Sequence, residues 1–140
     1  MKIYLSVPMI ANRTLERARI LEKAIKDSGH QVSSPWVLGP VEGGAGGVNV
    51  FERDRLGAES SDAILADVTE PSTGVGMEVM AAYKANRRII VVAKKGSRVS
   101  RMLTHMDRKE LVEFEDDDEL YGKLMEVLRS AQYGDGRVKE

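Results

Sequence analysis

The fold of this 140-residue chain is decided by the stretch Asp67-Val68-Thr69-Glu70-Pro71-Ser72-Thr73-Gly74-Val75-Gly76-Met77-Glu78. The apolar run before it, 63–66, predicts a buried strand, and the run after it, 79–85, predicts a helix. A strand, a turn with two glycines and a helix that begins with a carboxylate are how an α/β protein builds a site at the carboxyl edge of its sheet. Gly74 and Gly76 would let backbone N–H groups approach a ligand closely.

Glu78 is the residue in this stretch whose side chain is a candidate for catalysis. A helix over about 76–85 puts Glu78 in its first turn, where the positive helix end favours the ionised acid. We therefore expect an anion at neutral pH, and a carboxylate beside a ligand site is a candidate nucleophile or general base. The alternative is that Glu78 only stabilises the start of the helix by its charge.

Composition predicts a soluble globular protein, with 42% apolar and 31% charged residues. The length predicts one domain, 1–131, followed by a flexible polar tail, 132–140. A net charge of -1 gives no general attraction to nucleic acid or membranes, and the absence of cysteine excludes disulfides and thiol catalysis. No run is long and apolar enough to cross a membrane, so a cytoplasmic protein is expected. His30 and His105 lack metal-ligand spacing, and neither a metal nor a cofactor is expected.

Strands and helices alternate along the chain. The predicted strands are 3–7, 31–34, 63–68, 88–93 and 111–114, and the predicted helices are one that ends at Gly29, then 50–59, 76–85, 99–106 and 119–131. This pattern predicts an α/β, flavodoxin-like (Rossmann-like) three-layer sandwich with a five-stranded parallel sheet in the order 2-1-3-4-5. The first and third strands are neighbours in that order, so the segment after the first strand should face Glu78.

Four side chains could converge at this edge: Tyr4, Asp54, Asp67 and Glu78. Each of the first three has a simpler interpretation. Tyr4 is by default a core aromatic, Asp54 a solvated charge on a helix, and Asp67 a residue that caps a turn through Thr69 or Ser72.

Several segments together resemble the nucleoside 2-deoxyribosyltransferase superfamily, and most closely its hydrolase branch, the 2'-deoxynucleoside 5'-phosphate N-hydrolases. The resemblance is carried by residues 2–5, Arg13, residues 52–54 and residues 61–78. It implies a flavodoxin-like fold, a homodimer, and cleavage of the bond between a base and C1' of deoxyribose.

The resemblance also implies roles for individual residues. Glu78 matches the glutamate that attacks C1', Tyr4 the tyrosine that holds its carboxylate, and Asp54 the aspartate associated with the sugar and the leaving base. Ser72 matches a serine that contacts the 5'-phosphate; the transferases usually carry an acid there. The segment 7–13 lacks the serine and the first arginine of the hydrolases' phosphate-binding loop but keeps Arg13.

The implied substrate site has further members. Arg13, Ser72 and the N-terminus of the helix with Gly74 and Gly76 would supply part of the phosphate site, beside Asp67. Ser100 is the counterpart of a serine that reaches the phosphate from the partner subunit. Trp36, in the long loop 35–48, either closes over the base or packs in the core.

The sequence thus predicts hydrolysis of 2'-deoxynucleoside 5'-monophosphates to free base and deoxyribose 5-phosphate. Glu78 is the expected nucleophile, and no nucleic acid polymer is an expected partner. Two alternatives stay open. One is a nucleoside 2-deoxyribosyltransferase that exchanges bases on deoxyribose, and the other is a nucleotide-binding module without catalysis.

Overall fold

A computed structural model of the protein describes residues 1–9, 15–39 and 48–130. Its sheet contains five parallel strands: β1 (Lys2–Ser6), β2 (Gln31–Val32), β3 (Ala63–Asp67), β4 (Arg88–Lys94) and β5 (Lys109–Phe114). Their order is β2-β1-β3-β4-β5, which confirms the predicted flavodoxin-like topology. β1 and β3 are adjacent, with Tyr4 opposite Ile64 and Ser6 opposite Ala66.

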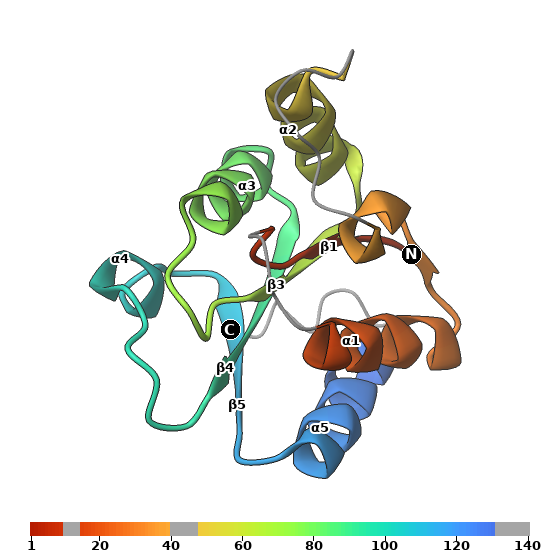
Figure 1. The fold of residues 1–140 in the computed structure, drawn as a ribbon, viewed down its shortest axis with the longest axis vertical. Helices are drawn as coiled ribbons and strands as arrows, with labels where there is room; N and C mark the ends of the chain where they lie inside the picture. The colour runs from red at the N-terminus through yellow and green to blue at the C-terminus, as the bar shows by residue number, and fades with distance from the viewer. Residues whose placement is uncertain (10–14, 40–47, 131–140) are drawn as a thin grey trace.

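Helices cover both faces of this sheet (Figure 1). They are α1 (Glu16–Asp27), the 3₁₀ helix η1 (Pro35–Leu38), α2 (Val50–Ser60), α3 (Thr73–Lys84), α4 (Arg101–Thr104) and α5 (Asp117–Ser130). α1 and α5 pack side by side on one face, and α2 and α3 pack together on the other, where α4 also lies. The three layers match the predicted sandwich.

Alternation along the strands divides the core between the two faces. In β1, Ile3 and Leu5 pack with α1 and α5, whereas Tyr4 packs on the side of α2 and α3. β3 is buried along its whole length, as expected of a central strand in a parallel sheet. Gly29 ends the α1 segment with φ +88°, a left-handed conformation that glycine adopts without steric cost.

The start of α3 differs from the sequence prediction in a way that matters for Glu78. α3 begins at Thr73, three residues earlier than predicted, because the Ser72 hydroxyl accepts a hydrogen bond from the Val75 amide and caps the helix. Glu78 therefore lies in the second turn of α3, beyond the N–H groups at the helix start that lack a partner within the helix. The expectation that it occupies the first turn was wrong.

Two smaller points concern the loops. The predicted loop 35–48 begins with η1, so Trp36 lies in a short helix, while residues 40–47 fall outside the described part of the chain. Arg13 and the predicted tail 132–140 also lie outside the described residues. Among the residues that the structure describes, no helix has the length and apolarity needed to span a membrane.

Candidate active site

The Glu78 carboxylate is held at both of its oxygens by hydroxyl groups from β1. Tyr4 Oη donates to Oε2 at 3.1 Å, and Ser6 Oγ donates to Oε1 at 2.5 Å. Tyr4 and Ser6 are two residues apart on one strand, so both side chains leave the sheet on the same face. Both are fully buried, while Glu78 itself is only half-buried. The two hydroxyls thus hold the carboxylate from the side of the sheet, while the partial exposure of Glu78 leaves the carboxylate accessible from outside.

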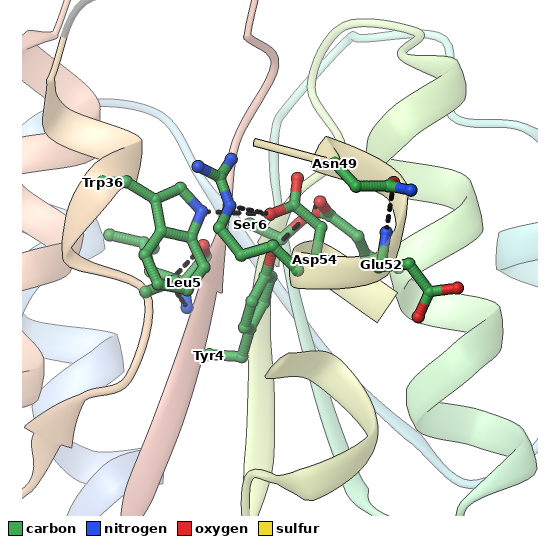
Figure 2. A network of polar contacts seen from close by, with 10 residues as sticks. Tyr4, Leu5, Ser6, Trp36, Asn49, Glu52 and Asp54 are labelled. Atoms are coloured by element: carbon green, nitrogen blue, oxygen red, sulfur yellow. Dashed lines mark hydrogen bonds and ion pairs between the residues drawn. The ribbon is translucent and has the colours of Figure 1, made fainter. Parts of the chain in front are cut away.

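Asp54 stands beside this group, held by two N–H donors at its Oδ1 atom. Trp36 Nε1 lies 3.1 Å away and Arg53 Nε lies 2.8 Å away. The Arg53 guanidinium also stacks over the Trp36 ring at 4.5 Å, and Trp36 meets the Tyr4 ring edge-on at 6.2 Å. Figure 2 shows Asp54 with Trp36 on one side and Tyr4 and Ser6 beside it. Trp36 thus packs partly against the core, and its role in closing over the base stays a prediction.

The start of α2 aims Asp54 at the site. Asn49 caps the helix by accepting from the Glu52 amide at 3.0 Å, which fixes where the first turn begins (Figure 2). Asp54 then follows in the next turn, with its side chain 13% exposed. It is therefore no solvated surface charge, and that simpler interpretation was wrong.

Burial is the main influence on Glu78 and raises its pKa from 4.5 to about 7. The negative charge of Asp54 acts in the same direction, whereas the hydrogen bonds from Ser6 and Tyr4 lower the pKa. Glu78 is consequently a mixture of acid and anion at neutral pH, which corrects the expectation of a plain anion. Burial, followed by the charges of Glu78 and Asp54, raises the pKa of Tyr4 far above its usual value, so Tyr4 stays a hydrogen-bond donor.

Asp67 lies on the opposite face of the sheet. Leu65 packs with the α1 and α5 side while Ala66 and Val68 pack with the other, and the alternation assigns Asp67 to the α1 and α5 side. Its carboxylate pairs with Arg17 Nε of α1 at 2.7 Å and accepts from the Thr69 amide at 3.0 Å. Three of the four expected groups come together, and Asp67 does not join them; its role in substrate binding stays a prediction.

The remaining predicted binding residues lie near the carboxyl edge of the sheet or beyond it. Gly74 and Gly76 are exposed in the first turn of α3, and a methyl group built on either would meet no atom within 4 Å. Ser72 caps that helix, and Ser100 is exposed and caps α4 by accepting from the Met102 amide at 3.1 Å. The loop between β3 and α3 is tied down because the Lys94 amide donates to Thr69 Oγ1.

Sequence reasoning missed Ser6 and Arg53. Ser6 was given no role, although its spacing of two from Tyr4 puts both side chains on one face of β1. Arg53 lies within residues 52–54, which carry the family resemblance, but no role was assigned to it. Within the described residues, no three His, Cys, Asp or Glu side chains are grouped as metal ligands would be.

A hollow lies at the opposite edge of the sheet. It has a volume of about 540 Å³ and is lined by Met1, Lys2, Gly29, Gln31, Ser60 and Asp62. Its one carboxylate, Asp62, accepts a hydrogen bond from the Lys2 amide at 2.7 Å. It therefore lacks the convergent acids that distinguish the Glu78 cluster as the candidate active site.

Comparison with known proteins identifies the family of the chain. A protein from Thermofilum pendens that carries the name 2'-deoxynucleoside 5'-phosphate N-hydrolase 1 is 32% identical to this chain over 136 residues. The match covers 91% of this chain and 95% of the relative. The chain belongs to this family. A family member of the same name from Methanococcoides burtonii is 32% identical over 108 residues, covering 74% of this chain and 88% of its own. No protein-family model matches the chain.

A solved structure shares the fold of the chain. A 2-deoxyribosyltransferase from Bacillus psychrosaccharolyticus superposes with a TM-score of 0.66 and 24% identity, covering 89% of this chain and 96% of its own. At this identity the likeness concerns the fold alone. The resemblance to the 2'-deoxynucleoside 5'-phosphate N-hydrolases, predicted from residues 2–5, 13, 52–54 and 61–78 of this chain, is confirmed by these relatives.

Proposed function

We propose that the protein hydrolyses the N-glycosidic bond of 2'-deoxynucleoside 5'-monophosphates, releasing free base and deoxyribose 5-phosphate, with Glu78 as the nucleophile. The observation that carries the proposal is the clamp on Glu78: Tyr4 and Ser6 hold its two oxygens while Asp54 lies beside it. The names of the family's members support the class of reaction and of substrate.

The reaction proceeds in two steps that follow the logic of retaining glycosidases. An oxygen of ionised Glu78 attacks C1', the bond from C1' to the base nitrogen breaks, and that electron pair leaves with the base. The base takes up a proton from solvent, relayed through Asp54. Water then attacks C1' of the glycosyl ester, which restores the Glu78 carboxylate, and the proton that this water loses passes back to solvent through Asp54. The sum is the addition of one water molecule across the glycosidic bond.

The chemistry requires an anion close to C1', because the transition state resembles an oxocarbenium ion. The Glu78 carboxylate supplies this charge without reorganisation, since its two oxygens already have their hydrogen-bond donors. A pKa of about 7 keeps a substantial anionic fraction at neutral pH. Tyr4 stays protonated and so holds the nucleophile in every step.

The 5'-phosphate binds at the N-terminal turn of α3 in this proposal. Ser72, Gly74 and Gly76 form that turn, and the free N–H groups of a helix start favour an anion. A neutral serine at position 72 leaves room for the phosphate charge, which an acid would repel. Arg13, from the segment that the structure does not describe, is proposed as the cationic partner.

The protein is proposed to act as a homodimer in which Ser100 reaches the partner's phosphate site. Apolar side chains are exposed along α2 and α3, which lie side by side: Val50, Phe51, Leu56, Met77 and Met80. α4, which Ser100 caps, lies on the same side of the sheet and carries the 80% exposed Met102 (Figure 1). Exposed apolar surface of this kind is typical of a face that another chain covers.

A substrate screen tests the proposal. The protein is incubated with each deoxynucleoside monophosphate, its ribonucleotide counterpart and the free nucleoside, with and without a second base, and the products are separated by chromatography. Base release from the deoxynucleotides, abolished in Glu78→Ala and Glu78→Gln, is the expected result. Appearance of an exchanged nucleoside would instead show a transferase. Tight ligand binding without base release over a long incubation would show a binding module.

A further inference from the structure

We propose that Ser6 is a positioning residue of this reaction: its buried hydroxyl holds Oε1 of Glu78 and so fixes the orientation of the carboxylate that attacks C1'. The inference rests on the proposed function for the role of Glu78, but the contact itself does not. Ser6 is fully buried, and its Oγ atom lies 2.5 Å from Oε1. This is at the short end for an O–H to carboxylate hydrogen bond.

The geometry explains why one hydroxyl is insufficient. Tyr4 holds Oε2 from the ring side, and a carboxylate held at one oxygen alone can still turn about its terminal bond, whose rotamers are broad. The second hydrogen bond, at Oε1, stops this rotation. Because both donors rise from the buried part of β1, the carboxylate is held to the sheet as well as to α3.

The groups around Glu78 give Ser6 a second effect. From α2, Asp54 faces Glu78 as a like charge, and its neighbours Arg53 and Trp36 donate to Asp54. From β1, Tyr4 and Ser6 donate to Glu78. Ser6 is the larger of the two influences that lower the pKa of Glu78 against burial. It therefore keeps part of the carboxylate ionised at neutral pH as well as oriented.

The test compares Ser6→Ala with Ser34→Ala. Ser34 is a suitable control because it is also fully buried, but its hydroxyl bonds to the backbone of Leu5, at 2.8 Å to the amide and 2.9 Å to the carbonyl. In Ser6→Ala, the acidic limb of the kcat/KM profile should move up by about one pH unit. On the alkaline plateau, kcat should fall about tenfold with little change in KM. Ser34→Ala should leave the acidic limb of the kcat/KM profile at its wild-type pH.

A titration that needs no activity completes the test. Glutamate labelled with ¹³C at its carboxyl carbon reports the pKa of Glu78 by NMR, and Glu78→Gln identifies the signal. The pKa should rise in Ser6→Ala and rise less in Ser6→Cys, whose thiol is a weaker donor. A folded Ser6→Ala protein with an unchanged Glu78 pKa and an unchanged pH profile would overturn the proposal. A shifted pKa in a protein that cleaves no nucleotide would leave the contact standing and refute the proposed function instead.

Discussion

Gly57 of α2 lies directly against the ring of Tyr4. A Cβ atom built at position 57 would come within 2.6 Å of Tyr4 Cε2 and 3.0 Å of Cδ2, closer than such atoms approach in folded proteins. The Tyr4 ring is fully buried between α2 and the sheet, so it has little freedom to give way. The missing side chain at position 57 therefore sets where the Tyr4 hydroxyl meets Glu78.

Gly57→Ala should impair catalysis more than stability. The added methyl group pushes the Tyr4 ring, at a cost of about 1–3 kcal/mol, while alanine returns up to about 1 kcal/mol through its better helix propensity. With the Tyr4 hydroxyl displaced from Glu78, kcat/KM should fall about tenfold or more. Steady-state kinetics and thermal unfolding measure the two effects.

Gly122→Ala is the matched control for this substitution. Gly122 also lies within a helix, α5, but a Cβ there meets no atom within 4 Å. It should gain up to about 1 kcal/mol in stability with unchanged activity. Equal activity of Gly57→Ala and the wild type would show that the Tyr4 ring tolerates the displacement.

Glu78 should destabilise the folded protein above neutral pH. Its folded pKa of about 7 exceeds the unfolded value of 4.5, so the unfolded state loses its proton first as the pH rises. The cost is absent below pH 4.5, grows between the two pKa values and is complete above pH 7, at roughly 3 kcal/mol. Glu78→Gln removes the charge and should therefore be more stable than the wild type at pH 8, with a smaller difference at pH 5.

Urea unfolding at both pH values measures the effect. Glu126→Gln, on the exposed side of α5, serves as the control and should change stability equally at pH 5 and pH 8. If Glu78→Gln is no more stable than the wild type at pH 8, then burial does not strain the carboxylate as the structure indicates.

The arrangement of the sheet followed from the sequence because its central strands are continuous apolar runs. β3 and β4 could only be buried on both faces, and helical patterns between strands require parallel crossovers. The order of the strands then brought Tyr4 of β1 near Glu78 of α3. These two residues meet as predicted because the topology alone decides which strand ends are neighbours.

Other features depend on contacts that pattern analysis does not contain. The face on which Asp67 lies depends on the register between β1 and β3. The start of α3 was misplaced because its two glycines suggested a turn, whereas the Ser72 cap begins the helix before them. The pKa of Glu78 and the role of Gly57 both follow from tertiary packing around Tyr4, which no local signal reveals.

Ser72 allows a direct test of phosphate recognition. Aspartate, asparagine and serine cap helices about equally well, so Ser72→Asp and Ser72→Asn should both preserve the start of α3. Only the aspartate adds a negative charge at the proposed phosphate site. The ratio of kcat/KM for a deoxynucleoside monophosphate to that for the free deoxynucleoside should fall at least about tenfold in Ser72→Asp relative to Ser72→Asn. Equal ratios in the two variants would place the phosphate elsewhere.

Leu56 tests whether α2 contributes to a dimer. Its side chain is 50% exposed on the isolated chain, so Leu56→Lys should cost the monomer little, and the new lysine lies four residues after Glu52, a favourable spacing on a helix. If another copy covers this surface, the buried lysine should shift the protein from dimer to monomer in light scattering coupled to gel filtration.

Leu111→Lys is the control, because Leu111 is 41% exposed on the edge strand β5, far along the sheet from α2. A Leu56→Lys protein that keeps the wild-type mass would exclude this face from the interface. Loss of activity in step with dissociation, and its recovery at higher protein concentration, would further support a site that the partner completes, because mass action restores the dimer.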